Sequence, residues 1–452
     1  MRLTPSQAII IIITIGIVMF MGSVLLAVIS PVEAGIMLIA TIAGLFIIWR
    51  PEIGFLLMII SLGVESIVIG APVTIFRMLG ILTFGTWLLR ELIAKRFSFA
   101  KTPQNLCIAG FIFTAILSVL FADAISLSLV RVFTFIQLFF LYLLVVSLVN
   151  SERKLNQVVW IWVISATAAS LYAIALFMWE ELPRAVGGIR DPNDLVLYLL
   201  IPIALTAYLF QMEKSNILKV FLGVSFGIFL AVTVVSFSRG GFIAVLFLLG
   251  LLFLKSPKKK SLVALILITA LFLTPILPFQ VWFDRIETIV DLDVAKAGRG
   301  DIWEGGVRMF LHNFIFGVGV GNFRFEYRQY GWIGSYEGLF AMVAHNAYVE
   351  IAAEQGVFGL LFFLLLIWLT YKDLRKTERF LRIVENYYIS NIAQALQIGF
   401  LSFLVGIMFL SQQHNKSLWL VVGLAVAIKM IYINKVNQIC TGINSVDGNS
   451  KE

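Results

Sequence analysis

The sequence predicts an all-α fold: a polytopic bundle of about 12–14 transmembrane helices with one long extracytoplasmic loop that contains short helices. Of the 452 residues, 60% are hydrophobic and only 13% are charged, whereas a soluble domain has about 25% charged residues. Apolar runs long enough to cross about 30 Å of hydrocarbon recur along the chain. The alternating strands of about ten residues that are typical of membrane barrels do not occur.

Each predicted span is an apolar run with few or no charges. The first run is longer than the hydrophobic part of a signal peptide and further runs follow it, which predicts a retained span. Several later runs are short, and two short neighbours can form one broken helix, hence the range in the count. The runs are 8–29, 34–49, 53–70, 73–94, 105–121, 126–149, 157–178, 194–210, 217–235, 240–254, 261–277, 343–370, 389–410 and 416–434.

Basic residues predict which loops face the cytoplasm. They gather in alternate loops, and the positive-inside rule places these loops inside. The unbroken alternation predicts an even number of spans, both termini inside, and outward-facing segments at 179–193, around Arg239 and at 279–342. The inner basic residues are Arg90, Lys95, Arg96, Lys101, Arg153, Lys154, Lys214, Lys219, Lys255, Lys258, Lys259, Lys260, Lys372, Arg375, Lys376, Arg379 and Arg382.

The net charge of +8 is therefore assigned to cytoplasmic loops next to the lipid bilayer, and no nucleic-acid partner is expected. The two cysteines, Cys107 in an apolar run and Cys440 in the polar tail, do not predict a disulfide.

Arginine dominates the basic residues of the outer side. Its planar fork binds phosphate through two hydrogen bonds and keeps its charge, so the pattern favours a phosphorylated substrate there. The long loop also carries acidic residues, and structural ion pairs are the alternative for any one arginine. The outer arginines are Arg184, Arg190, Arg239, Arg285, Arg299, Arg308, Arg324 and Arg328.

Arg239 lies between two apolar runs with almost no room for a loop, and Gly240 and Gly241 follow it. A charge at membrane depth costs at least about 2.5–3.5 kcal/mol on insertion scales, so such residues are usually paired or functional. The glycines allow a tight turn and the close approach of another group. A snorkelling anchor at the outer interface is the structural alternative.

Arg299 lies between two glycines, just before a predicted amphipathic helix at 302–311. We expect Asp301 to cap this helix, with Glu304 in capping-box spacing, and Trp303, Val307 and Phe310 to share its apolar face. Arg299 would face a substrate cavity; an ion pair with a neighbouring acid is the alternative.

His345 lies where the long loop re-enters the membrane at the span 343–370. An imidazole with a pKa near 6.5 accepts a proton at neutral pH, which makes His345 the candidate catalytic base; helix capping is the alternative. Asn346 and Glu350 are spaced to share a helix face, and an acid inside an apolar run needs a partner.

Three patterns carry less information. Residues 190–194 predict a turn and a helix start, with Arg190 and Asn193 on a polar cavity wall. The glycines of 317–321 predict a closely packed turn, because no βαβ unit surrounds them. The pair Asp291 and Asp293 is too isolated to predict a metal site, and we expect no metal and no cofactor.

Taken together, Ser238-Arg239-Gly240-Gly241, Arg299 before a tryptophan-bearing helix, Phe316 to Phe323, and His345-Asn346 with Glu350 resemble the O-antigen ligase and polymerase superfamily. Order and spacing match from about residue 190 to 370; before that the chain is similar only in being helical and apolar. His312-Asn313 departs from the pattern, because the family often has a proline before the glycine-rich run.

The resemblance implies a GT-C-like glycosyltransferase in a bacterial plasma (inner) membrane, with its active site facing the periplasm or exterior. The donor would be a glycan on undecaprenyl diphosphate, and the acceptor another glycan, lipid A core or protein. Arg239 and Arg299 would bind the diphosphate and His345 would activate the acceptor, giving inversion without a metal. The other expected cavity residues are Arg190, Asn193, Asp301, Arg308, Asn346 and Glu350.

The implied organisation has four parts: N-terminal transmembrane helices (1–189), the ligase-like region (190–370) with its outer loop (279–342), C-terminal transmembrane helices (371–434) and a cytoplasmic tail (435–452). A multispan transporter, for example of inorganic carbon, or a flippase for lipid-linked glycans is the alternative function. Transporters show inverted repeats and charges at mid-span, whereas here no repeat is visible and the charges lie at the outer ends of the spans.

Overall fold

The computed structural model describes residues 41–64, 74–95, 101–180, 184–189, 191–256, 258–273, 299–331 and 343–448, with side chains up to residue 433. The described part is helical, and eight of its helices are long and apolar enough to cross a membrane. This confirms the predicted polytopic α-helical bundle. The predicted span 8–29 lies outside the described residues.

The chain divides into two compact units, which we describe separately. The first, residues 1–58 and 76–98, holds most of α3 (Pro51–Ser61) and α4 (Ile75–Ile93). A Cβ at Gly54 would lie 2.2 Å from Thr83 Oγ1, so the glycine lets the two helices approach closely.

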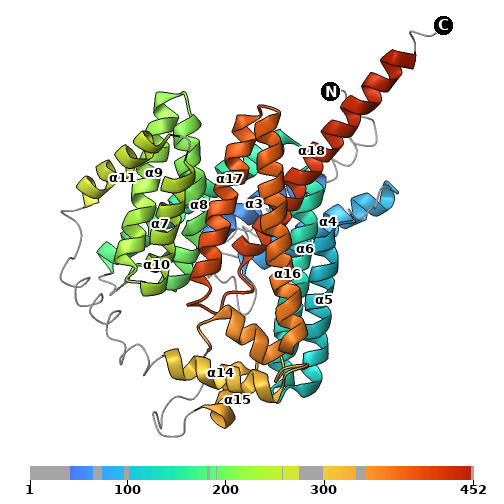
Figure 1. Cartoon of the computed structure of the whole chain (residues 1–452), viewed down its shortest axis with the longest axis vertical. Coiled ribbons are helices and arrows are strands. Elements are labelled where there is room, and N and C mark those ends of the chain that lie inside the picture. Colours follow the sequence, from blue (N-terminus) through green and yellow to red (C-terminus); the bar gives the residue numbers. More distant parts are fainter. Residues whose placement is uncertain are drawn as a thin grey trace, which may run out of the picture. The chain divides into compact units, whose positions relative to one another are not determined.

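The second unit, residues 59–75 and 99–452, carries all the site residues discussed below. Figure 1 shows its helices running up and down beside one another, with α14 and α15 gathered at one end. The elements are η1 (Leu62–Val64), α5 (Pro103–Ser118), η2 (Val119–Phe121), α6 (Ile125–Leu148), α7 (Glu152–Trp179), η3 (Gly187–Ile189), α8 (Pro192–Met212), α9 (Asn216–Val235), α10 (Arg239–Lys255), α11 (Lys259–Leu273), α14 (Asp301–His312), α15 (Phe323–Tyr330), α16 (Ala347–Ile383), α17 (Tyr387–Gly406) and α18 (Lys416–Gly448).

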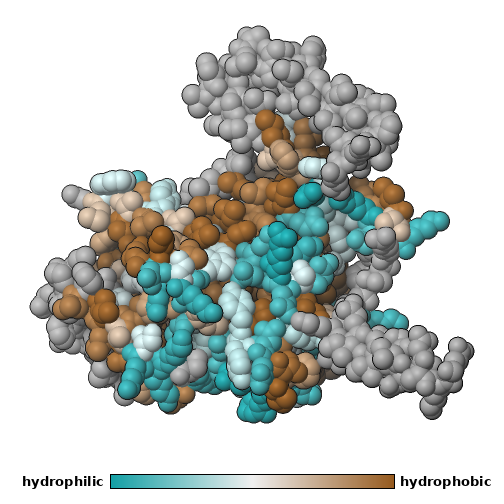
Figure 2. Space-filling model, turned by 90° about the horizontal axis from the view of Figure 1, so that it is seen from above, coloured by the Kyte–Doolittle hydropathy of each residue, from teal (hydrophilic) through white to brown (hydrophobic). Residues whose placement is uncertain are grey.

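The up-and-down course places the connections α6–α7, α8–α9, α10–α11 and α16–α17 at one end of this unit, opposite α14 and α15 (Figure 1). These connections and the adjoining helix ends carry the lysines and arginines predicted to face the cytoplasm, except Arg90, Lys95, Arg96 and Lys101. Figure 2 views the molecule from that end and shows hydrophilic residues gathered between hydrophobic flanks. Arg239 and His345, at the starts of α10 and α16, lie at the opposite end.

The core forms around α8, the most deeply buried of the eight helices, which packs against α17, α9 and α10. Glycines on α17 bring its backbone close to α8. A Cβ at Gly399 would lie 2.9 Å from the Cα of Ile201, and one at Gly406 would lie 2.4 Å from Leu197 Cδ2. Small residues at helix contacts are the usual means of close packing in membranes.

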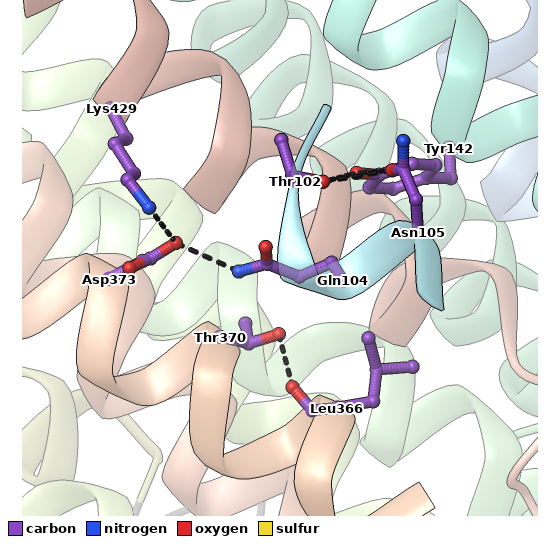
Figure 3. Close-up of polar contacts among 8 residues, drawn as sticks. All are labelled: Thr102, Gln104, Asn105, Tyr142, Leu366, Thr370, Asp373 and Lys429. Atoms are coloured by element: carbon purple, nitrogen blue, oxygen red, sulfur yellow. Dashed lines mark hydrogen bonds and ion pairs between the residues drawn. The ribbon is translucent and has the colours of Figure 1, made fainter. Parts of the chain in front are cut away.

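A buried polar cluster ties α5, α16 and α18 together (Figure 3). Lys429 Nζ and Gln104 Nε2 both donate to Asp373 Oδ2, at 2.9 and 2.8 Å. Asp373 and Gln104 are buried. Removing one partner of such a cluster leaves the other uncompensated.

We expect Asp373→Leu to lower the free energy of unfolding by on the order of 2 kcal/mol, below the value of about 3–5 for fully buried pairs, because a third of the Lys429 side chain is exposed (33%). Asp373→Asn keeps an oxygen for Gln104 and should lose less. Thermal unfolding of both variants in detergent measures the difference; equal losses would contradict the role of the hydrogen bond.

The last predicted span, 416–434, agrees with the candidate span Lys416–Ile433. Beyond this span α18 continues as a helix to Gly448. The polar residues after 434 therefore extend the same helix in the structure.

Candidate functional site

The glycine-rich turn 317–321 is a packing device. Gly317, Gly319 and Gly321 all have positive φ, the region that glycine adopts without strain. A Cβ at Gly317 would lie 2.3 Å from the carbonyl carbon of Glu354, and one at Gly319 would lie 2.5 Å from Ala122 Cβ. The prediction of a closely packed turn is confirmed.

The backbone N–H groups of this turn are used within the protein. Val318 N donates to the Ala353 carbonyl (2.9 Å) and Gly319 N to that of Glu354 (3.1 Å). Val320 N donates to Ser118 Oγ (3.0 Å). Because these donors are already occupied, the turn does not serve as a phosphate cradle.

The turn also fixes the start of α16. Gly356 interrupts that helix with φ 67° and ψ −165°, so residues 347–355 form a separate segment before the long span (Figure 1). Val357 N donates to the Phe314 carbonyl (2.8 Å) inside this kink. The Glu354 side chain accepts a hydrogen bond from Phe323 N (3.0 Å), which joins the kinked helix to the start of α15.

We expect Gly317→Ala to destabilise the protein by at least about 1–3 kcal/mol, the cost of a non-glycine residue in a strained conformation, with the clash against Glu354 in addition. Gly250→Ala is the matched control, because nothing lies within 4 Å of a Cβ there. Thermal unfolding of both variants in detergent tests this; equal melting temperatures would be the contrary result.

Arg239 is the first residue of α10. Ser238 caps the helix, accepting a hydrogen bond from Gly241 N (3.1 Å), and its hydroxyl donates to Asn193 Oδ1 (2.7 Å). The predicted close approach at the glycines is present, since a Cβ at Gly240 would lie 2.7 Å from Phe409 Cβ. Asn193 is thereby a support for the Arg239 turn, and Arg239 itself is half-buried.

The helix after Arg299 forms as predicted, but its cap and buried face differ. Gly300 occupies the N-cap position and no side chain caps it, so the expected Asp301 cap is wrong: Asp301 already lies in the first turn. The buried face comprises Ile302, Gly305, Gly306 and Met309. It replaces the expected face of Trp303, Val307 and Phe310 because the two glycines admit Tyr327 and Val349.

α14 also positions the residue before His345. Trp303 Nε1 donates to the Ala344 carbonyl (3.0 Å), which joins the first turn of α14 to the segment entering α16. His345 has φ 47°, a left-handed conformation that non-glycine residues adopt only when their surroundings enforce it. The structure thus fixes the His345 backbone relative to Arg299.

The residues after His345 hold the start of α16. Asn346 is the cap: its Oδ1 accepts hydrogen bonds from Tyr348 N (3.0 Å) and Val349 N (3.2 Å). Capping is therefore the role of Asn346, which leaves the imidazole of His345 available for another. Glu350 Oε1 accepts from Gln413 Nε2 (2.9 Å), a partner that the sequence did not indicate.

Arg239, Arg299 and His345 come together from three distant segments. Arg299 is half-buried, and burial together with the nearby charge of Arg239 lowers its pKa. Burial and the charge of Arg299 lower the pKa of His345 below its ordinary 6.5, against the opposing charges of Glu350 and Asp191. His345 is therefore neutral at pH 7 and able to accept a proton.

The remaining predicted residues lie elsewhere or outside the described part. Arg308 forms an exposed ion pair with Glu304, as the structural alternative expected. Asp301 is near Tyr327, and burial together with the charge of Asp301 raises the pKa of Tyr327. Arg190, Asp291 and Asp293 are outside the described residues. Within the described part of the chain, no group of three or more acidic, histidine or cysteine side chains is placed to hold a metal.

Sequence reasoning missed two contributors to the site. Asp191 caps α8 through Asn193 N and Asp194 N (2.7 and 3.2 Å) and acts on His345 by its charge. Gln413 belongs to the connection between α17 and α18. Only the Asp191 turn had a local signal, namely the acidic residue before a proline at a helix start.

Comparison with known proteins bears on the region that holds these residues. Residues 224–364 match the family model described as O-antigen ligase. The match includes Arg239, Arg299 and His345. No curated protein matched the chain.

Proposed function

We propose that this multi-pass membrane protein, whose residues 224–364 match the O-antigen ligase family model, transfers a glycan from undecaprenyl diphosphate to an acceptor hydroxyl. The family indicates a role in surface polysaccharide assembly. The observation that carries the finer proposal is the convergence of two arginines and one neutral histidine at one end of the bundle.

Arg239 and Arg299 act on the leaving group. When the bond between the anomeric carbon and the diphosphate oxygen breaks, negative charge develops on that oxygen. Fixed positive charge stabilises this change most when it is placed beforehand and shielded from water. Both arginines are half-buried, and the proximity of two like charges raises the energy of the empty site, which favours an anionic ligand.

His345 acts on the acceptor. Its neutral imidazole takes the proton of the attacking hydroxyl as the new glycosidic bond forms. The electron pair of the old bond leaves with the diphosphate, and the imidazolium then loses its proton to water. The carboxylates of Glu350 and Asp191 favour the imidazolium. A single displacement of this kind inverts the anomeric carbon and needs no metal.

The test is glycan transfer by the purified full-length protein in liposomes. The donor is an undecaprenyl-diphosphate-linked oligosaccharide, and EDTA is present throughout. One arm receives no added acceptor, a second receives lipid A core, and a third receives protein. Longer lipid-linked chains would identify a polymerase; transfer only to lipid A core or protein would identify a ligase. No transfer in any arm, by folded protein, would contradict the proposal and favour transport.

A further inference from the structure

A polar cavity lies beside the candidate site and takes no part in the chemistry described above. It has a volume of about 280 Å³, close to the lower end of the range of about 300–1,000 Å³ for small-molecule sites. Its described lining is Leu62, Thr74, Ile189, Asp194, Tyr198, Gln412, His414, Asn415 and Ser417. The size suits one sugar ring rather than a lipid or a long oligosaccharide.

Two elements are shared between the cavity and the His345 site. The first turn of α8 contributes Asp194 to the cavity, and the cap of the same helix, Asp191, acts on His345. The connection between α17 and α18 contributes His414 to the cavity, and the preceding Gln413 binds Glu350. The same two elements therefore carry both the cavity wall and residues that act on the His345 site.

The cavity wall is held in place by its own hydrogen bonds. Gln412 Nε2 donates to Asp194 Oδ1 (2.6 Å), and Asn415 Nδ2 donates to Gln412 Oε1 (3.4 Å). Ser417 N donates to Asn415 Oδ1 (2.9 Å). A wall that is already ordered loses little conformational freedom when a ligand binds.

His414 is a half-buried residue of this wall. Its Nδ1 is buried and has no hydrogen-bond partner among the described residues, which is rare for a buried nitrogen. Burial and the charges of Arg131 and Lys416 hold its pKa well below 6.5. A neutral imidazole both donates and accepts hydrogen bonds.

The chemistry of the lining matches a sugar hydroxyl face. The lining combines amide, hydroxyl and neutral imidazole groups with the apolar Leu62 and Ile189, which suit the C–H surface of a ring. Asp194 is the acidic residue of the described lining, so the wall disfavours a phosphate. We propose that this cavity is a binding subsite for one sugar unit of a glycan substrate, an inference that rests on the proposed transferase function.

The test measures binding and transfer with the full-length protein in detergent. The binding probes are the oligosaccharide released from the lipid-linked donor and, separately, undecaprenyl diphosphate; calorimetry gives the affinities. The variants are Gln412→Leu and His414→Phe, with His414→Asn as the conservative change and Arg239→Ala as the control for the diphosphate site. Unchanged melting temperatures show that each variant is folded.

We expect Gln412→Leu and His414→Phe to weaken oligosaccharide binding about ten-fold each, as for loss of one well-formed hydrogen bond to a buried wall, and to leave undecaprenyl diphosphate binding unchanged. Arg239→Ala should weaken the binding of undecaprenyl diphosphate and leave oligosaccharide binding unchanged. His414→Asn should retain most of the affinity. In transfer, a raised KM for the acceptor would assign the sugar to the acceptor, and a raised KM for the donor would assign it to the donor.

The outcomes separate the two proposals. Wild-type affinity for the oligosaccharide in both folded cavity variants, or no oligosaccharide binding by the wild type, would overturn the subsite even if transfer is observed. Binding that depends on Gln412 and His414 in a protein that transfers no glycan would support the subsite and overturn the transferase function.

Discussion

Replacing His345 is expected to slow glycan transfer by about 10²–10⁴-fold, the usual contribution of a general base. His345→Asn is the sharper of two variants, because asparagine tolerates the left-handed backbone at this position, where φ is 47°. His345→Ala removes the imidazole but also adds backbone strain. Initial rates per folded protein, at saturating donor and acceptor, measure the loss.

His312→Ala is the matched control for this prediction. His312 lies exposed on α14, where its Nδ1 contacts the Arg308 carbonyl at 2.9 Å, so its loss should leave the rate within about two-fold, as for surface changes generally. Near-normal transfer by both His345 variants, at normal melting temperature, would remove His345 from the mechanism.

The pH dependence gives an independent measure of the same group. The base is active when deprotonated, so the rate should fall as pH falls through the pKa of His345. Burial and Arg299 place that pKa below 6.5. The value of kcat/KM, which reports the protein before substrate binds, should therefore be level near pH 7 and decline only in acid, and a midpoint above 6.5 would contradict the neutral imidazole.

The sequence could predict the helices because they follow from local composition, whereas the sidedness that the basic loops indicate stays a prediction. Apolar length determines what crosses a bilayer, and basic loops mark one side. Arg239 and His345 were visible for the same reason: a charge or an imidazole at the edge of an apolar run is unusual. The structure places Arg299 near both of them, which no single stretch could show.

Other features depend on contacts that composition does not carry. The buried face of α14 contains Gly305 and Gly306, which a hydrophobic pattern does not count as apolar. Because they lack a side chain, Tyr327 and Val349 can pack closely against the helix. Gln413 is 63 residues from Glu350, and nothing local in its segment indicates the contact. Capping by Asp301 failed because the backbone before it is already helical at Gly300.

Replacing Arg239 or Arg299 with alanine should slow transfer by about 10²–10³-fold each, similar to the loss of one preorganised donor that stabilises developing charge. Lysine at either position keeps the charge but loses the planar fork, so we expect a smaller loss, about ten-fold. Rates at saturating donor measure both. Arg324→Ala is the matched control, because Arg324 is exposed on α15 and stacks on Phe325.

The two arginines should not act independently. If both bind one diphosphate, the double alanine variant loses less than the product of the single losses, as is usual for groups that act as a unit. A fully multiplicative loss would place them on separate groups.

Arg299→Ala should change the pH profile as well as the rate. The charge of Arg299 lowers the pKa of His345, so its removal raises that pKa and shifts the acid decline in rate to higher pH. Arg239→Ala should shift the decline less, since Arg299 is the arginine whose charge acts on His345. Two groups close enough to act on one glycosidic bond must also interact through their charges. Equal pH profiles in wild type and Arg299→Ala would therefore mean that the arginine and the histidine do not share one site.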